Sequence, residues 1–274
     1  MNEDAAKALD RLVSAYRAGR ALVLLLDYDG TLTPIVEHPR LAVLTPETRG
    51  LLERLSRLPR VAVGVLSGRS LADITRLVGL PGLYYAGTGG MEIDLRGRSL
   101  RHPKEREAAT LVAAVAERLG NVLAAWGGAW VERKPFGLTV HYRAVSVSQI
   151  EELIRSVDLS LAPWGTRLVT VTGPMAIEVL PAEGWTKGAA VQFILDHVGQ
   201  DAALPVYVGD EANDAEAFAF VAERGGVTIG VGPQAPPEAI YQLSGPEEVG
   251  ELLAMLLDSL AASPRLSIHA TKPG

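Results

Sequence analysis

The 274-residue sequence contains no cysteine. This absence excludes a disulfide framework, a thiolate zinc site and a cysteine nucleophile. Lysine is scarce, because only five of the 26 basic residues are Lys and 21 are Arg. Long hydrophobic runs are also missing: the apolar runs reach six residues, as in 21–26, whereas a helix needs about 18 to cross a bilayer. We therefore predict no membrane-spanning helix.

The charge balance is acidic, with 32 acidic against 26 basic residues and a net charge of −6. Binding to a nucleic-acid backbone requires a surplus of Lys and Arg, so we predict no nucleic-acid partner. The first residues are acidic and no hydrophobic segment follows them, which predicts no signal peptide. The apolar content of 48% excludes a disordered polymer. We expect a monomeric, cytoplasmic protein with no membrane partner.

Short apolar runs alternate with longer amphipathic stretches over much of the chain, as is typical of βαβ units and a parallel sheet. The expected strands are 21–26, 60–66, 83–86, 205–208 and 227–231, and the expected helices are 45–58, 70–78, 187–198, 214–223 and 246–260. An amphipathic N-terminal segment, 4–18, is expected to pack on this core.

The pattern changes between about residue 101 and residue 181. Helical stretches at 104–119 and 146–157 flank a hairpin, 129–134 with 138–143, whose turn is Pro135-Phe136-Gly137. A further strand pair is expected at 167–171 and 176–180. The sequence thus predicts the α/β class: a Rossmann-like parallel-sheet core of residues 1–98 and 182–274, with an inserted α+β domain at 99–181.

Polar residues follow the predicted strands at their carboxyl ends, where parallel sheets bind ligands. The first strand ends at Asp27-Tyr28-Asp29, the second at Ser67-Gly68-Arg69, and the strand after the insertion at Gly209-Asp210, with Asp214 four residues on. Clustered carboxylates repel one another unless a divalent cation joins them, and oxygen ligands suit Mg²⁺. Such a site can perform phosphoryl transfer, in which a carboxylate can serve as the nucleophile.

Lys187 follows Gly184-Trp185-Thr186 at the start of a predicted helix. A lysine at this position is notable because the chain uses Arg four times as often. The compact ammonium group is suited to hold a phosphoryl oxygen, helped by the helix N-terminus.

These four motifs, in this order along the chain, resemble those of the haloacid dehalogenase superfamily of phosphatases. The resemblance implies Asp27 as the nucleophile and Asp29 as the acid that protonates the leaving oxygen and later activates water. It implies Mg²⁺ held by the Asp27 carboxylate, the Asp29 backbone carbonyl and Asp210. It also implies that Glu211 and Asp214 support the metal, Asp214 through the waters of the metal or through Lys187. Ser67, Gly68 and Lys187 would hold the phosphoryl oxygens. The insertion would be a cap domain that selects the substrate.

Within that superfamily the sequence is similar to the trehalose-6-phosphate phosphatase family, in segments 85–92, 131–134, 141–143 and 178–188. This similarity implies a sugar phosphate as substrate and trehalose biosynthesis as the setting. Carboxylates can accept hydrogen bonds from sugar hydroxyls, and cationic side chains can donate them. Taken singly, alternating charged residues also fit the solvated face of a hairpin. The candidate substrate-binding residues are Arg69, Glu132, Lys134, His141, Arg143 and Glu178.

The chain departs from that family's pattern in two places. The family usually has His where this chain has Gly89. In the last motif the family usually reads Gly-Asp-Asp-x-Thr-Asp, whereas residues 209–214 of this chain read Gly-Asp-Glu-Ala-Asn-Asp, with Glu211 and Asn213 as the differences. Three enzymatic alternatives therefore stay open: a phosphatase for sucrose phosphate, one for glucosyl- or mannosyl-3-phosphoglycerate, and a phosphosugar mutase. A phosphate-sensing module is the alternative outside catalysis, and the paired acid Asp29 argues against it.

Overall fold

The protein is described here from a computed structural model that covers residues 2–134, 136–173, 175–183, 186–199 and 202–262. Pro135 of the predicted hairpin turn and the Gly184-Trp185 pair before Lys187 lie outside the described residues. Over the described ranges, no helix is both long and apolar enough to cross a membrane.

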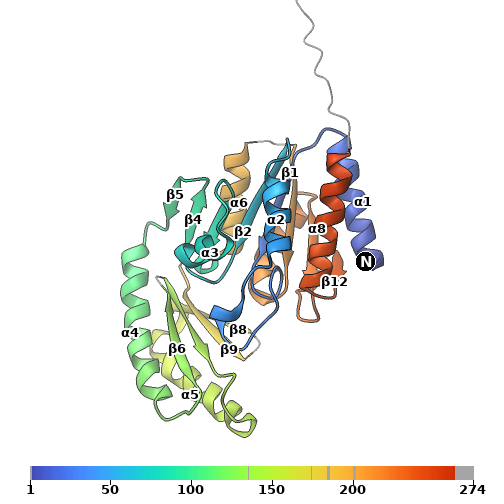
Figure 1. The fold of residues 1–274 in the computed structure, drawn as a ribbon. Coiled ribbons are helices and arrows are strands. Elements are labelled where there is room, and N and C mark those ends of the chain that lie inside the picture. The colour runs from blue at the N-terminus through green and yellow to red at the C-terminus, as the bar shows by residue number, and fades with distance from the viewer. Residues whose placement is uncertain (1, 135, 174, 184–185, 200–201, 263–274) are drawn as a thin grey trace, which may run out of the picture.

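An eight-stranded sheet forms the larger part of the molecule (Figure 1). Its strand order is β12-β11-β10-β1-β2-β3-β4-β5, and pairing is parallel from β12 to β3 and antiparallel from β3 to β5. The sheet thus brings the carboxyl ends of β1, β2 and β10 side by side. The strands are β1 (Leu22–Asp27), β2 (Val61–Leu66), β3 (Tyr84–Gly87), β4 (Glu92–Leu95), β5 (Ser99–Arg101), β10 (Leu204–Gly209), β11 (Val227–Val231) and β12 (Tyr241–Leu243).

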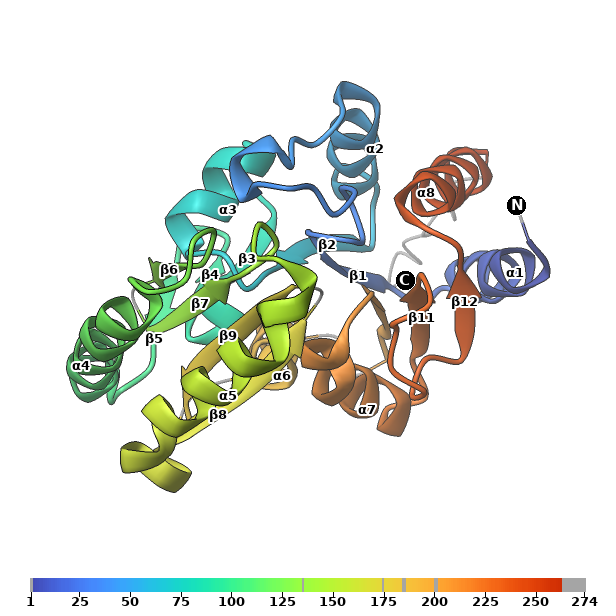
Figure 2. The same ribbon diagram turned by 90° about the horizontal axis from the view of Figure 1, so that it is seen from below.

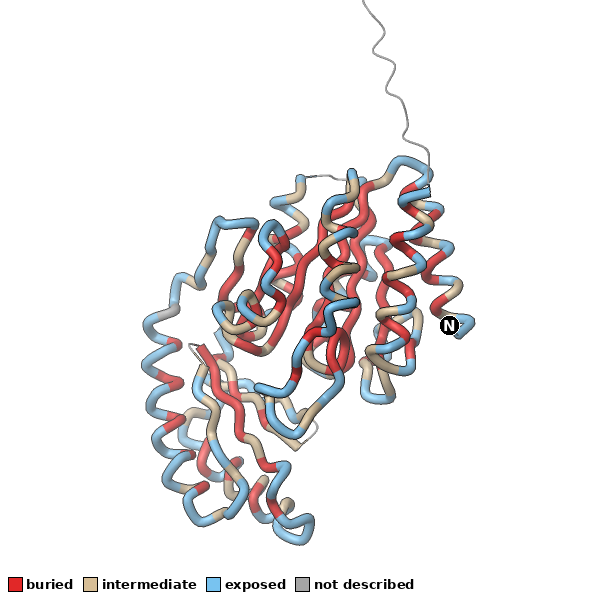
Figure 3. Tube along the Cα trace, in the orientation of Figure 1, coloured by how far each residue is buried: buried red, intermediate tan, exposed pale blue. Residues whose placement is uncertain are grey.

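Helices cover both faces of this sheet, as Figure 2 shows. Residues of α1 (Glu3–Arg17), α2 (Pro46–Ser56), α3 (Leu71–Val78) and α8 (Pro246–Ala261) pack on one face, and those of α6 (Lys187–Val198) and α7 (Ala215–Glu223) pack on the other. Because both faces are covered, every residue of β1, β2, β10 and β11 is buried (Figure 3). This burial explains why the sequence shows continuous apolar runs there.

A four-stranded antiparallel sheet forms the second part, in the order β6-β7-β9-β8. The strands are β6 (Trp130–Lys134), β7 (Gly137–His141), β8 (Leu168–Gly173) and β9 (Ala176–Pro181). One face, with Leu138, Val140, Ile177 and Val179, packs on α4 (Glu105–Leu123) and α5 (Ile150–Leu161). Alternation then turns the polar residues of these strands toward the larger sheet.

The α/β class and the parallel core are confirmed, and nearly all the predicted elements are present within a few residues of their expected ends. Three short strands, β4, β5 and β12, had no predicted counterpart, because each has only three or four residues. β5 pairs with β4, so the larger sheet extends three residues into the range predicted for the insertion.

Candidate active site

Asp27 ends β1 and is buried, with 3% of its surface exposed. The chain turns immediately after it at Gly30, whose φ is +87°. A Cβ on Gly30 would lie 2.0 Å from Asp210 Oδ2, so only glycine allows the two strand ends to approach this closely. Thr31 Oγ1 donates to Asp210 Oδ1 at 3.2 Å and ties the β1 turn to the end of β10.

Lys187 lies at the centre of the buried charges. Its Nζ donates to Asp27 Oδ1 at 2.7 Å, to Asp214 Oδ1 at 2.7 Å and to Asn213 Oδ1 at 2.6 Å. It is the first residue of α6, and Thr186 caps that helix by accepting a hydrogen bond from Ala189 N at 3.2 Å. The cap fixes the start of the helix and with it the position of the ammonium group.

Asp214 is fully occupied by protein donors. Its Oδ1 accepts from Lys187 and also from the Tyr207 hydroxyl at 2.6 Å, while Oδ2 accepts from the backbone N–H groups of Asp210 at 3.0 Å and Glu211 at 3.2 Å. This carboxylate therefore holds the loop after β10 and the lysine in place.

The buried cluster of Asp27, Asp210, Asp214 and Lys187 is unbalanced in charge, because it has three carboxyl groups and one ammonium group. Burial raises the pKa of Asp27, and the negative charges of Asp214 and Asp210 add to this effect against the pull of Lys187. Burial, together with Asp214 and Glu211, raises the pKa of Asp210 to about 7. For Lys187, burial lowers the pKa, but Asp214 and Asp27 outweigh it and leave the pKa well above its usual value. In the described part of the chain, Lys187 is the one cation paired with this cluster.

The donor set fits a divalent cation. Asp27, Asp210 and Asp214 each place one carboxylate oxygen so that all three lie within 4.8 Å of one another. Because Asp214 is held by four donors, Asp27 and Asp210 are the carboxylates with oxygens to offer. Asp27 and Asp210 are buried and their pKa values are raised, so these two carboxylates need positive charge beyond that of Lys187 to ionise together.

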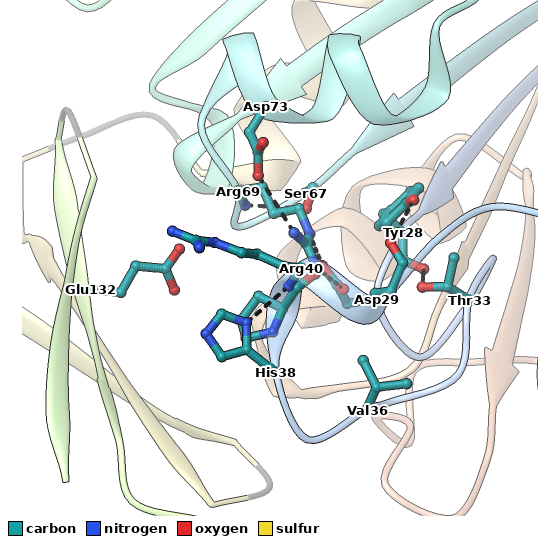
Figure 4. A network of polar contacts seen from close by, with 12 residues as sticks. Tyr28, Asp29, Thr33, Val36, His38, Arg40, Ser67, Arg69, Asp73 and Glu132 are labelled. Carbon is teal, nitrogen blue, oxygen red and sulfur yellow. Dashed lines mark hydrogen bonds and ion pairs between the residues drawn. The ribbon is translucent and has the colours of Figure 1, made fainter.

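Asp29 follows Asp27 by two residues and faces Arg69 (Figure 4). Arg69 Nε donates to Asp29 Oδ2 at 2.7 Å and Nη2 donates to Oδ1 at 2.6 Å, a bidentate pair. Arg69 also donates to the carbonyl of Pro39 at 2.8 Å, and its own N–H bonds to Ser67 Oγ at 3.1 Å. The Ser67-Gly68-Arg69 turn thus holds the Asp29 carboxylate in place at the edge of a cleft.

A cleft of about 650 Å³ separates the cluster from the four-stranded sheet. Its far wall is the polar face of that sheet, where Glu132 and Thr139 are register partners, as are Thr139 and Glu178. Lys134 Nζ pairs with Glu178 Oε1 at 2.9 Å, and His141 Nε2 lies 2.7 Å from Glu132 Oε2.

The predicted site residues assemble around this one cleft. Those that line it are Asp27, Asp29, Ser67, Gly68, Arg69, Glu132, Lys134, His141, Arg143, Glu178 and Glu211. Lys187, Asp210 and Asp214 lie behind Asp27, as the hydrogen bonds above describe. Arg143 is turned partly to the larger sheet's side, because its Nη1 donates to the carbonyl of Val36 at 3.2 Å.

Sequence reasoning missed several residues that line the cleft, among them His38, Trp130, Thr139 and Asn213. Trp130 stacks on His141 with ring centroids 4.3 Å apart, and on His38 from the other part of the molecule at 5.7 Å. The alternation of β6 was the available signal for Trp130, since it shares a face with Glu132 and Lys134. His38 lies in an irregular loop, which gives no such signal.

The fold, with its carboxylate and lysine cluster at the carboxyl ends of β1 and β10, is of the haloacid dehalogenase type. Among solved structures, the C-terminal domain of the C. albicans trehalose-6-phosphate phosphatase superposes with a TM-score of 0.81 at 23% identity, over 91% of this chain and 96% of that one. The Aspergillus fumigatus trehalose-6-phosphate phosphatase gives 0.61 at 26% identity, over 92% and 97%.

The profile of the trehalose-phosphatase family matches residues 25–242, and the chain belongs to this family. A relative described as probable trehalose-phosphate phosphatase D, from Arabidopsis thaliana, is 34% identical over 255 residues, which cover 88% of this chain and 68% of the relative. The trehalose-phosphate phosphatase of Mycobacterium avium is 36% identical over 257 residues, 89% of this chain and 64% of the relative. The chain thus spans less than two thirds of the mycobacterial relative.

Proposed function

We propose that this protein is a Mg²⁺-dependent phosphatase that hydrolyses trehalose 6-phosphate to trehalose and inorganic phosphate. Family membership and the named relatives support the reaction and the substrate. The observation that carries the proposal is the junction of Lys187 with Asp27, beside Asp210 and at the floor of a cleft with a polar wall.

In the proposed reaction, an Asp27 carboxylate oxygen attacks phosphorus and the bond from phosphorus to the sugar oxygen breaks. Asp29 gives its proton to that oxygen, so trehalose leaves as a neutral alcohol. Asp29 then takes a proton from water, which attacks the phosphoryl group on Asp27 and releases inorganic phosphate. Ser67 and Lys187 hold the phosphoryl oxygens, and Lys187, whose three N–H donors are all bonded within the protein, exchanges its bond to Asp27 for one to the phosphoryl group. The backbone of Gly68 approaches the phosphoryl group closely because no side chain intervenes.

Mg²⁺, when bound, neutralises the charge that develops on the phosphoryl oxygens. Asp27 and Asp210 would hold it with the backbone carbonyl of Asp29, while Asp214 keeps Lys187 and the β10 loop in position. Oxygen donors alone favour Mg²⁺ over softer metals.

Arg69 has a double part in this proposal. When Asp29 is protonated, one of its two oxygens carries the proton that Asp29 donates to the leaving group. Asp29 then cannot keep both of its short hydrogen bonds to the Arg69 guanidinium. The Arg69 N–H group that loses Asp29 as its acceptor is then available to the substrate. This exchange agrees with the expectation that Arg69 binds substrate.

Residues 99–181 form, in this proposal, the cap domain on a core of 1–98 and 182–274. Glu132, Glu178, Lys134, His141 and Arg143 then bind the sugar from the far wall. The protein acts as a cytoplasmic monomer on this small-molecule substrate.

Phosphate release from trehalose 6-phosphate tests the proposal. We expect release that requires Mg²⁺, stops on chelation and falls at least about 1,000-fold in Asp27→Asn, since no covalent intermediate can then form. Activity that persists in Asp27→Asn, or after complete chelation, would contradict the mechanism.

A further inference from the structure

Glu211 and Asn213 follow β10 and form one hydrogen-bonded unit with Lys187. Asn213 Oδ1 accepts from Lys187 Nζ at 2.6 Å, and Asn213 Nδ2 donates to Glu211 Oε1 at 2.6 Å. An amide carries its acceptor and its donor on two separate atoms, so a single side chain holds both partners in one geometry. The direction of the Glu211 carboxylate is therefore fixed by the same residue that contacts the lysine of the cluster.

Glu211 reaches across to the four-stranded sheet. Its Oε2 lies 2.9 Å from the point that a Cβ on Gly173 of β8 would occupy. The converse contact is present as well, because Glu178 Oε1 of β9 lies 2.9 Å from the Cβ position of Gly68. Each part of the molecule thus supplies a glycine that makes room for a glutamate of the other.

The two glutamates line the same cleft and act on each other electrostatically. Burial raises the pKa of Glu211, Lys187 opposes the rise, and the charges of Asp214 and Glu178 add to it. Lys134 is paired with Glu178, and Lys187 is separated from Glu211 by Asn213. Two acceptor groups that face one cleft are best satisfied by a neutral ligand with several O–H donors, whereas a carboxylate on the ligand would be repelled.

We propose that Glu211 is a specificity-determining residue that accepts hydrogen bonds from hydroxyl groups of the sugar, opposite Glu178 and in an orientation set by Asn213 and Gly173. This inference rests on the proposed function, because it assumes that a sugar phosphate occupies the cleft. It gives Glu211 a role at the sugar in place of the predicted role beside the metal. It also disfavours substrates such as glycosyl-3-phosphoglycerates, which carry a carboxylate.

The test compares a sugar phosphate with p-nitrophenyl phosphate, an ester whose leaving group has no sugar hydroxyls. For Glu211→Gln we expect kcat/KM on trehalose 6-phosphate to fall about 10- to 100-fold, the loss typical of a hydrogen bond to a charged acceptor, mainly through KM. Hydrolysis of p-nitrophenyl phosphate and the Kd for Mg²⁺ from calorimetry should stay within about twofold of wild type.

Gly173→Ala tests the contact from the side remote from the metal. A methyl group there must displace the Glu211 carboxylate or β8, so we expect a rise in KM for trehalose 6-phosphate of about tenfold with p-nitrophenyl phosphate hydrolysis unchanged. Gly120→Ala is the matched control, since a Cβ there meets nothing within 4 Å. The Gly173→Ala variant keeps the test valid if Glu211→Gln fails to fold.

The outcomes separate this inference from the proposed function. Equal losses on both esters, or a weaker Kd for Mg²⁺ in Glu211→Gln, would assign Glu211 to the metal and overturn the inference. If Gly173→Ala has the same kinetics as Gly120→Ala, the contact between Gly173 and Glu211 does not orient Glu211, and that part of the inference is overturned. Wild-type protein that ignores trehalose 6-phosphate but hydrolyses another sugar phosphate would instead overturn the proposed substrate alone.

Discussion

At the residue scale, the site depends on how closely two strand ends approach each other. Gly30 permits that approach through its positive φ and its missing side chain. Asp27, Asp210 and Asp214 then come together with one lysine, and the negative charge that remains unbalanced suits the cluster to a cation.

Gly30→Ala is expected to weaken Mg²⁺ binding about 10- to 100-fold, as for other changes that move a ligand, because the new Cβ meets the Asp210 carboxylate. Calorimetric titration with Mg²⁺ measures this effect. The matched control is Gly82→Ala, which has a similar φ of +82° and no atom within 4 Å of its Cβ. If both variants lose the same affinity, backbone strain rather than the carboxylate contact is responsible.

The affinity for Mg²⁺ should depend on pH through Asp210. Its pKa of about 7, against an ordinary value of 3.8, means that the folded metal-free protein keeps a proton that the unfolded chain loses. The metal-free protein therefore loses stability as pH rises between these two values, and Mg²⁺ must displace that proton below about 7. We expect the Kd to weaken at least about tenfold for each pH unit below 7, because the pKa of Asp27, the other carboxylate ligand, is raised as well. A Kd that is constant between pH 5 and 8 would contradict this account.

The strand-end residues were predictable from sequence because continuous apolar runs mark buried parallel strands, and their carboxyl ends must meet at one edge. Asn213 was not predictable, because its partner Lys187 is 26 residues away in the sequence and becomes its neighbour only once α6 and the β10 loop are packed together. The pairing of Arg69 with Asp29 was missed for the same reason.

At the element scale, the alternation of β7 divides its residues between two environments. Thr139 faces the cleft between Glu132 and Glu178, whereas Val140 is fully buried against α4 and α5. The sequence pattern predicted the hairpin and its two faces, but which face met the ligand depended on the docking of the helices.

Exchanging the polarity of these two neighbours tests the assignment of faces. Thr139→Val should raise KM for trehalose 6-phosphate about fivefold by removing a hydroxyl from the cleft, with little change in thermal stability. Val140→Thr should instead lower the free energy of unfolding by about 1–3 kcal/mol, because its hydroxyl is buried without a partner. Steady-state kinetics and denaturant titration measure the two effects, and the reverse pattern would show that the faces are misassigned.

At the scale of the whole molecule, an acidic protein with a net charge of −6 must attract a doubly charged phosphate ester. The distribution of charge resolves this difficulty in our account: Mg²⁺ turns a repulsive carboxylate cluster into a phosphate site, with Lys187 behind it and Lys134 on the opposite wall. Two of the five lysines thus serve one cleft.

The presence of two sheets was largely predictable, because the sequence pattern changes from parallel to α+β at the predicted insertion. Its start was harder to locate, since β4 and β5 continue the larger sheet as an antiparallel extension too short to show a clear period. The contacts of the two parts through Gly68 and Gly173 were not predictable, because glycine in a turn or at a strand end has many explanations.

The central claim is tested most directly by the rate of phosphate release from a panel of sugar phosphates at equal concentration with saturating Mg²⁺. The panel contains trehalose 6-phosphate, glucose 6-phosphate, sucrose 6-phosphate and a glycosyl-3-phosphoglycerate. We predict that trehalose 6-phosphate is hydrolysed at least about tenfold faster than the others. A faster reaction with any other member of the panel would contradict the account.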